Sequence, residues 1–360
     1  MADTRLMNVA AALREATDLC MARDPRVFVM GEGVADPKAI FGTTAGLLER
    51  YGRDRVMEMP IAENGFTGVA IGAALLGRRP LIIHQRVDFA LLALEQLVNN
   101  AAKTRYVSNG RHRVPLVVRM IVGRGWGQGP AHSQSLDALF AMIPGLKLVL
   151  PTTAREAKGQ LIAAIEDDDP VMMIEHRWVH YATGHVPEGY YTVPLDGPRR
   201  VREGGDVTIV ATSYMLLEAL RAADTLAQAG VQADVIDMAV PRPFRPQLVV
   251  DSVRRTGRLL CIDTGFRLFG IGAELVASVA EQALGSLAKP PVRLGLPDHP
   301  TPSTRALLTD FYPTALSIID AAAELADVPV ERIAGPREAL AVELSKLPMD
   351  VPHPTFRGPF

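Results

Sequence analysis

The sequence predicts an α/β fold with a doubly wound parallel-sheet domain first and a smaller α/β domain after it. Strand-like apolar runs alternate with helical patterns along the first half of the chain, which is typical of a parallel sheet with helices on both faces. The alternation stops at a polar stretch rich in Gly and Pro, and then resumes in a shorter second series. A chain of 360 residues fits two domains of the usual size, about 150 residues each.

The first domain is predicted to span residues 1–185. Its strands are the runs rich in Val, Ile and Leu: RVFVM (26–30), PLIIH (80–84), PLVVRMIV (115–122), LKLVL (146–150) and PVMMIEH (170–176). Its helices are the segments in which apolar residues recur every three or four positions, at 4–20, 65–77, 88–106 and 154–166.

A linker at 186–205 is predicted to lead into the second domain, at 206–328. Here the strands DVTIVATS (206–213), ADVIDM (233–238) and RLLCID (258–263) alternate with helices at 214–229 and near 246–255. Residues 329–360 hold six prolines, and proline lacks the N–H that helices and sheets need, so this segment is predicted to be a Pro-rich tail lying on a surface.

Composition excludes several classes of function. Hydrophobic residues make up 48% of the chain, charged residues 22%, and the net charge is −2, so no surface is built for nucleic acid or an anionic membrane. No apolar run reaches the ~18 residues of a membrane span, and the amino terminus lacks the pattern of a secretion signal. Cys20 and Cys261 lie in separate apolar runs and are expected to be reduced, buried thiols in a cytoplasmic protein.

The first candidate for chemistry is the segment IAENGFTGVAIGAALLG at 61–77, in which short-spaced glycines open an apolar helix. Glu63 stands at or just before the amino terminus of that helix, where the helix dipole favours a carboxylate. Glu63 is therefore either a capping residue or a functional acid, and its spacing does not decide between the two.

The second candidate is the loop GRGWGQGPAHSQS at 123–135, which directly follows a predicted strand. Ligands of open α/β sheets sit beyond the carboxyl ends of the strands, where a histidine such as His132 can act as an acid or base. The alternative is a flexible surface loop in which His132 starts a helix. GIGAEL at 270–275 has two of the three glycines of a dinucleotide-binding fingerprint, so we interpret it as helix packing.

The segment IAENGF and several blocks after it resemble the beta subunit of the thiamine diphosphate-dependent, decarboxylating component of 2-oxo acid dehydrogenases, of the pyruvate, branched-chain and acetoin type. The resemblance covers roughly residues 5–325 and rests on ordered blocks at 61–74, 87–110, 114–119, 129–176 and 201–210. It implies a thiamine diphosphate pyrimidine-binding domain followed by a transketolase-type C-terminal domain.

The resemblance also implies a site. Glu63 matches the family glutamate that bonds to the aminopyrimidine ring of the cofactor, Phe89 the aromatic residue that packs on this ring, and His132 the active-site histidine. Ile61 and Gln85 fall at positions that line the cofactor. A further set resembles a potassium-binding segment acting mostly through backbone carbonyls, with a solvated acidic turn as the alternative: Leu116, Ala164, Ile165, Asp167 and Asp169.

These residue types suit the chemistry of the family. A buried carboxylate that shares a proton with the pyrimidine ring favours the tautomer that activates the cofactor. The 2-oxo acid then loses carbon dioxide, and the acyl or enamine unit passes to an acceptor, with His132 expected to stabilise charge or assist the transfer. Arg86 and Trp126 depart from the family pattern and indicate a substrate with additional anionic or polar groups.

The sequence contains no Gly-Asp-Gly motif, through which this family binds the cofactor diphosphate and magnesium. We therefore expect an alpha-type subunit to supply Mg²⁺ and the diphosphate half of the site in an α2β2 heterotetramer, with a lipoyl acyltransferase as a further partner. The helix at 88–106 is either part of that interface or ordinary core. Two other functions remain open: the C-terminal half of a split transketolase-like carboligase, and a non-catalytic subunit, against which the retained Glu63 and His132 argue.

Overall fold

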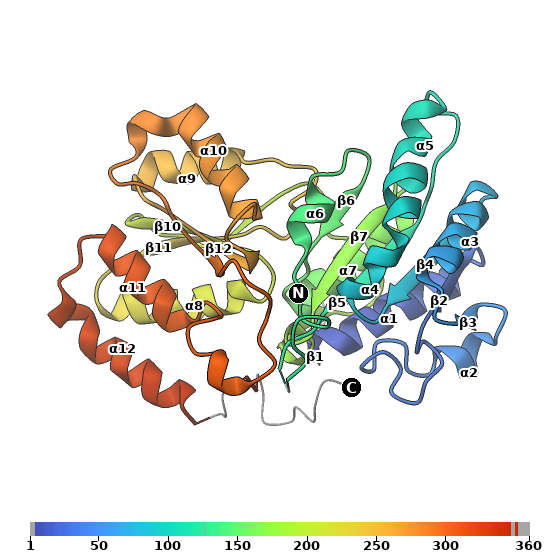
Figure 1. Cartoon of the computed structure of the whole chain (residues 1–360), viewed down its shortest axis with the longest axis horizontal. Helices are drawn as coiled ribbons and strands as arrows, with labels where there is room; N and C mark the ends of the chain where they lie inside the picture. Colours follow the sequence, from blue (N-terminus) through green and yellow to red (C-terminus); the bar gives the residue numbers. More distant parts are fainter. Residues whose placement is uncertain (1–3, 126, 347–349, 352–360) are drawn as a thin grey trace. The chain divides into compact units, whose positions relative to one another are not determined.

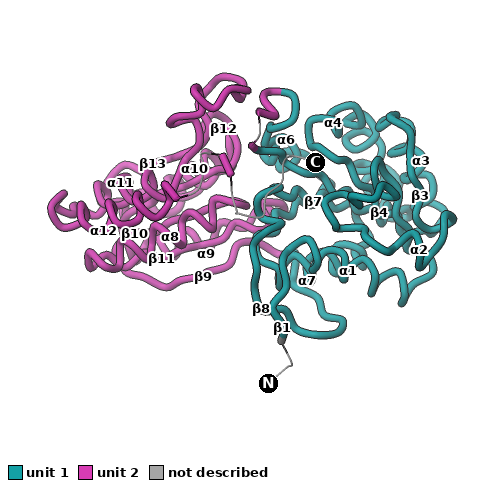
Figure 2. The backbone as a smooth tube through the Cα atoms, turned by 90° about the horizontal axis from the view of Figure 1, so that it is seen from below, with its two compact units in different colours: residues 1–124, 131–195, 357–360 teal, residues 125–130, 196–356 magenta. Residues whose placement is uncertain are grey.

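The computed structural model describes residues 4–125, 127–346 and 350–351, which divide into two compact units (Figure 1, Figure 2). Unit 1 contains the described residues 4–124 and 131–195, and unit 2 contains the others. The main change of unit, after Leu195, falls within the segment expected to be a linker.

Unit 1 is built on a six-stranded sheet in the order β3-β2-β4-β5-β7-β6, in which all neighbours are parallel. The strands of this unit are β1 (Thr4–Asn8), β2 (Val27–Gly31), β3 (Val56–Glu58), β4 (Arg79–His84), β5 (Val117–Val122), β6 (Lys147–Val149), β7 (Val171–His176) and β8 (Thr183–Pro187). Its α-helices are α1 (Val9–Arg23), α2 (Leu47–Tyr51), α3 (Glu63–Leu75), α4 (Val87–Ala90), α5 (Ala102–Val107), α6 (Asp137–Ala141) and α7 (Ala154–Glu166).

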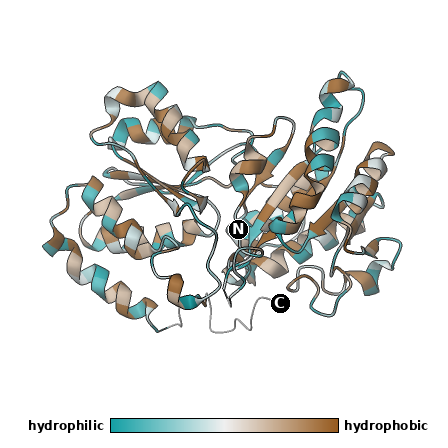
Figure 3. Ribbon diagram, viewed as in Figure 1, coloured by the Kyte–Doolittle hydropathy of each residue, from teal (hydrophilic) through white to brown (hydrophobic). Residues whose placement is uncertain are grey.

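Burial on both faces explains why the strands are apolar without alternation. Every residue of β5 and β7 is buried, as expected for central strands of a parallel sheet that is covered by helices on two sides. α1 packs against α7, whereas α3 packs against the segment that follows β4. Figure 3 shows apolar residues along the strands, and a mixture of apolar and hydrophilic residues on the helices that cover them.

Unit 2 holds a five-stranded sheet in the order β13-β12-β10-β11-β9, in which only β9 is antiparallel. Its strands are β9 (Arg199–Arg202), β10 (Val207–Ala211), β11 (Ala233–Asp237), β12 (Leu259–Phe266) and β13 (Val292–Leu296). Its α-helices are α8 (Met215–Gln228), α9 (Gln247–Thr256), α10 (Ile271–Ala283), α11 (Ala315–Leu325) and α12 (Val330–Leu344). α8 packs with α11 and α12, and α9 packs with α10. The α/β prediction for both halves is confirmed.

Two helices differ from the prediction. The segment expected to be helical from residue 4 begins as β1, which pairs with β8, and the helix starts only at Val9, where the Asn8 side chain accepts a hydrogen bond from the Ala11 amide. The helix expected at 88–106 is divided into α4, a 3₁₀ turn at Leu91–Ala93, a π-helical stretch at Gln96–Ala101 and α5. Local periodicity carries no information on pairing with a strand 175 residues away, or on a π-bulge.

The prediction of a tail from residue 329 is wrong for its first half, because α12 spans Val330–Leu344 with Pro336 inside it. A proline in a helix interior removes one hydrogen bond and costs about 3 kcal/mol. Tertiary contacts offset this cost, because Ile333 is buried and the Arg337 guanidinium donates two hydrogen bonds to Asp320 on α11. Most of the second half of the predicted tail lies outside the described residues.

Candidate active site

Four loops of unit 1 leave the sheet at the same edge. β3, β2, β4 and β5 are neighbours and run parallel, so their carboxyl ends lie side by side. Glu63 follows β3, Glu32 follows β2, Gln85 follows β4, and His132 lies in the loop after β5. The parallel register therefore brings together side chains that are up to 100 residues apart in the sequence.

Glu63 is the first residue of α3 and is 4% exposed. Its carboxylate makes no hydrogen bond to any residue that the structure describes, and no side chain caps the amino terminus of α3. The capping interpretation of Glu63 is thus not supported by a contact. α3 is held against the sheet by Phe66, whose ring stacks on His84 at the end of β4 with centroids 5.1 Å apart.

Glu32 is a buried acid that the sequence analysis missed. Burial, then the charges of Glu63 and Glu58, raise the pKa of Glu32 from 4.5 to about 7. Its Oε1 atom is buried and lacks a hydrogen-bond partner among the described residues. Glu32 and Glu63 therefore form a pair of neighbouring acids in a poorly solvated place, where one of them holds a proton more readily than an isolated carboxyl does.

Close packing between β2 and β4 fixes Glu32 and Gln85. A Cβ atom at Gly31 would lie 2.3 Å from the carbonyl oxygen of Ile83, and Gly33, with φ +75°, would bring a Cβ within 2.4 Å of the Gln85 amide nitrogen. Gln85 in turn donates a hydrogen bond of 3.3 Å to the backbone oxygen of Glu32. Only glycine fits these two positions, which is the local signal that could have located Glu32.

Phe89 and His132, which the family resemblance singled out separately, are in contact. Their ring centroids are 5.3 Å apart, in an edge-to-face arrangement, which is a favoured geometry for ring contacts. Phe89 belongs to α4, directly after β4, and His132 lies in a turn without helix or strand structure. Ile61, by contrast, is 87% exposed, and its link to the site is that it lies two positions before Glu63 in the sequence.

Arg86 is 2% exposed and takes part in a buried stack. Its guanidinium lies 5.2 Å from the ring centroid of Phe41, over which Arg177 lies at 4.1 Å, and it donates a 2.7 Å hydrogen bond to the backbone oxygen of Gln85. Burial and the charge of Arg177 lower the pKa of Arg86 to about 10. The sequence analysis missed Phe41 and Arg177; Trp126, which it named beside Arg86, lies outside the described residues.

A buried ion network supports this side of the sheet. Arg119 on β5 donates to both carboxylate oxygens of Glu175 on β7, at 2.5 and 2.8 Å, and His180 contacts the second oxygen at 2.9 Å. Burial alone would raise the pKa of Glu175, but Arg119 and His180 lower it to about 2. Glu175 is therefore ionised at neutral pH and holds β5 and β7 together.

The expected potassium segment lies at the other edge of the sheet. The backbone oxygens of Ile165 and Asp167 both accept hydrogen bonds from one nitrogen of Arg79, at 2.9 and 3.0 Å, and the oxygen of Leu116 accepts from the Val171 amide. The Asp167 carboxylate binds Lys147 at 2.5 Å, and the Asp169 carboxylate binds Arg105 at 2.5 Å. Ala164 is buried beside them in α7. Both carboxylates of this partly exposed acidic turn are ion-paired.

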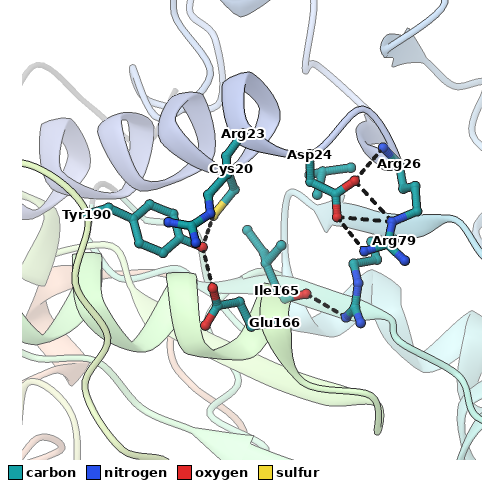
Figure 4. A pocket seen from close by; sticks show the side chains of 9 residues that line it. Cys20, Arg23, Asp24, Arg26, Arg79, Ile165, Glu166 and Tyr190 are labelled. Carbon is teal, nitrogen blue, oxygen red and sulfur yellow. Dashed lines mark hydrogen bonds and ion pairs between the residues drawn. The ribbon is translucent and has the colours of Figure 1, made fainter.

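A cavity of about 220 Å³ adjoins this edge, where α1 and α7 end and β2 and β4 begin (Figure 4). Its charged groups are largely occupied by one another. Arg26 is bonded to Asp24, Arg79 to backbone oxygens, and the Tyr190 hydroxyl to Glu166 at 2.7 Å. The cavity lies where β2 and β4 begin, whereas Glu32 and Glu63 lie beyond the carboxyl ends of β2 and β3. The cavity is therefore separate from these acids.

Cys20 and Cys261 are both buried free thiols, as predicted. Within the described ranges, no cluster of three or more His, Cys, Asp or Glu side chains could hold a metal ion, and none of the helices there is long and apolar enough to cross a membrane.

The two units match the two domains of transketolase. Residues 5–179 match the family model of the transketolase pyrimidine-binding domain, and residues 198–318 that of the transketolase C-terminal domain. The fold is also that of a split-gene transketolase solved as an inactive beta4 tetramer, with a TM-score of 0.71 at 24% identity over 89% of this chain and 99% of that chain. Transketolase from Leishmania mexicana has the fold with a TM-score of 0.66 at 16% identity, over 91% of this chain and 46% of that one.

Relatives of higher identity narrow the family. The chain is 39% identical to the beta subunit of acetoin:2,6-dichlorophenolindophenol oxidoreductase from Cupriavidus necator, over 88% of this chain and 97% of that one. It is 40% identical to the mitochondrial pyruvate dehydrogenase E1 component subunit beta-1 from Arabidopsis thaliana, over 84% of both chains. The chain therefore belongs to the family of pyruvate dehydrogenase E1 and acetoin oxidoreductase beta subunits.

The raised pKa of Glu32 predicts a pH effect on stability. Between about pH 4.5 and pH 7 the folded state binds more protons at Glu32 than the unfolded state, so this contribution to the free energy of unfolding falls as the pH rises through 7. Glu32→Gln should flatten the pH dependence and make the protein more stable than the wild type at pH 8. Denaturant unfolding between pH 5 and pH 8 measures this, with the exposed Glu49→Gln as the control. An unchanged pH slope in Glu32→Gln would contradict the prediction.

Proposed function

We propose that this chain is the beta subunit of a thiamine diphosphate-dependent 2-oxo acid dehydrogenase, and that it supplies the pyrimidine half of the active site. The observation that carries the proposal is the buried Glu63 at the start of α3, beside Glu32 and on the same sheet edge as Phe89 and His132. The family models and the relatives of 36–40% identity support the same assignment.

The residues present fit the cofactor. Glu63 is buried without a hydrogen-bond partner among the described residues, and a ring nitrogen of an aminopyrimidine would share a proton with its carboxyl group. Phe89 offers an aromatic ring at the same sheet edge, in contact with His132. When bound, the cofactor supplies the carbon that attacks the 2-oxo acid and holds its electrons as carbon dioxide leaves.

The protein's own part is to hold protons and exclude water. Glu63 holds a proton at the pyrimidine ring, and the neighbouring charge of Glu32 affects where that proton resides. His132, fixed edge-on by Phe89, is placed to donate a hydrogen bond to charge that develops on the substrate. The split transketolase alternative rests on a structure that is only 24% identical, which shows a shared fold and not a shared reaction.

We further propose that an alpha-type subunit completes the site with the diphosphate and Mg²⁺ half, in an α2β2 assembly, because the chain has no Gly-Asp-Gly motif. Exposed apolar side chains before, along and after α3, and in the segment after α4, support a covered surface there: Ile61, Val69, Leu76 and Leu92. Much of the segment 88–106 belongs to the core of unit 1, since Ala93, Leu97 and Ala101 are buried. A lipoyl acyltransferase as a further partner is proposed on the family resemblance alone.

Glu63→Gln should leave the fold intact and nearly abolish turnover. An amide cannot exchange a proton with the pyrimidine ring, so activation of the cofactor fails, with a loss of about 10²- to 10⁴-fold. Exchange of the cofactor carbon proton, followed by NMR in the complex with the alpha subunit, measures this step directly. Exchange at the wild-type rate in the variant would remove Glu63 from its assigned role.

The isolated chain should not bind the cofactor tightly. Calorimetry with magnesium and thiamine diphosphate is expected to show no stoichiometric binding to this chain alone, and binding only after the alpha subunit is added. Glu63→Gln in the complex serves as the control for heat that comes from the pyrimidine half. Tight binding to the single chain would show that it carries a complete site.

Arg86 is proposed to help select the substrate, because a guanidinium beside Gln85 and the cofactor-binding Phe89 favours a 2-oxo acid with a second anionic group. Arg86→Gln should therefore change the ranking of 2-oxo acids by kcat/KM, with the largest loss for dicarboxylic substrates. Since Arg86 also stacks on Phe41, a uniform loss with all substrates would assign it a structural role instead.

We also propose a potassium ion beside Arg79, bound by the backbone oxygens of Ile165 and Asp167, each of which has a second lone pair. The other contributors are Leu116, Ala164 and Asp169. An ion that binds only the folded state raises the apparent Tm by mass action. Thermal unfolding in KCl should thus give a higher Tm than in NaCl at equal ionic strength, and equal values in the two salts would exclude the site.

A further inference from the structure

Asp88 holds the loop that carries His132. One carboxylate oxygen of Asp88 accepts two hydrogen bonds from Gln134, one from its side-chain amide at 2.9 Å and one from its backbone amide at 3.3 Å. Asp88 lies in α4, next to Phe89, and Gln134 is two residues after His132. Two adjacent residues of α4 therefore contact the same loop. Asp88 does so through hydrogen bonds, and Phe89 through its ring contact with His132.

The loop needs such contacts. Residues 133–136 form neither helix nor strand, so no backbone ladder sets their position. Downstream of Gln134, the hydroxyl of Ser135 is hydrogen-bonded to Asp137 at the start of α6, at 3.2 Å. The contact between Asp88 and Gln134 thus links the loop through polar groups to the segment after β4, where Gln85 and Phe89 lie.

The Asp88 carboxyl is unusual for a loop anchor. It is 8% exposed, and its second oxygen, Oδ2, is buried without a hydrogen-bond partner among the residues described. Burial raises the pKa of Asp88, whereas the bonds from Gln134 and the charge of His132 act against this rise. A buried carboxylate oxygen normally has a donor, and the group whose charge acts on Asp88 from this loop is the His132 imidazole.

We infer that Asp88 is a positioning residue for His132. By its hydrogen bonds to Gln134, Asp88 keeps the loop in the position at which the His132 ring contacts Phe89. The inference rests on the proposed function, because it needs His132 to act on the substrate. It predicts that loss of the Asp88 contact impairs the step served by His132 and spares the earlier step served by Glu63. A purely structural residue would affect both steps or neither.

The test uses the complete complex with the alpha subunit and two measurements. Exchange of the cofactor carbon proton reports on Glu63, and single-turnover consumption of the best 2-oxo acid from a substrate screen reports on His132. Asp88→Ala should slow the second about 10- to 100-fold, because a small misplacement of a catalytic group has effects of this size, and should leave the first unchanged. Asp88→Asn should restore most of the rate, since its amide oxygen still accepts from Gln134.

A double-mutant cycle decides whether Asp88 acts through His132. In a His132→Ala background, adding Asp88→Ala should cause no further loss, because the group that Asp88 positions is already absent. Gln134→Ala removes the side-chain hydrogen bond of the same contact from the loop side, and it should also slow the second step. It replaces Asp88→Ala in the test if Asp88→Ala folds poorly. The exposed Asp54→Ala is the control for loss of a carboxylate elsewhere in unit 1.

The outcomes separate this inference from the proposed function. If the wild-type complex shows no exchange of the cofactor proton, the proposed function fails. If the wild type exchanges normally but the losses from Asp88→Ala and His132→Ala multiply, only the role of Asp88 is overturned. A rate for Asp88→Asn as low as that for Asp88→Ala would likewise overturn positioning through the Gln134 hydrogen bonds.

Discussion

The parallel pairing of β4 with β2 on one side and β5 on the other is the constraint on which the candidate site depends. Parallel strands end at a common edge, so the loops after them must meet there. The close approach of Gly31 to Ile83 leaves no room for a side chain between β2 and β4. This close approach thereby fixes where Glu32 and Gln85, the residues directly after β2 and β4, lie relative to each other at the carboxyl edge of the sheet.

This edge combines groups that do not favour folding by themselves. Glu32 and Glu63 are buried acids that repel each other, and Arg86 and Arg177 are buried cations over one ring. Like charges in a poorly solvated place are unfavourable, and such clusters are found mostly at functional sites. The ion network in which Arg119 on β5 and His180 both contact Glu175 on β7 lies in the same sheet and holds the scaffold around them.

The proposed half-site is consistent with the same arrangement. Glu63 and Ile61 are only two positions apart in the sequence, yet Glu63 is buried and Ile61 is almost fully exposed. The acid is thus held by unit 1, while the surface beside it is left apolar and open on this chain. A partner subunit that covers Ile61 would also exclude water from Glu63, which would strengthen every electrostatic interaction of that carboxylate.

Much of the fold was legible in the sequence, because runs of Val, Ile and Leu that alternate with helical spacing have few other solutions. The blocks around Glu63 and His132 also pointed to the family, and the contact of Phe89 with His132 agrees with that assignment.

Tertiary structure alone decided the rest. Phe41, Asp88 and Arg177 carry no local motif, and Glu32 is marked only by its flanking glycines. The contacts of these residues arise only where strands distant in sequence end side by side. Pairing of β1 with β8 replaced a helical start, and packing on α8 and α11 allowed α12 to form around Pro336. The physical reason is common to these cases: periodicity reports which face of an element is buried, whereas pKa values, ion pairs and close backbone contacts depend on which other element covers that face.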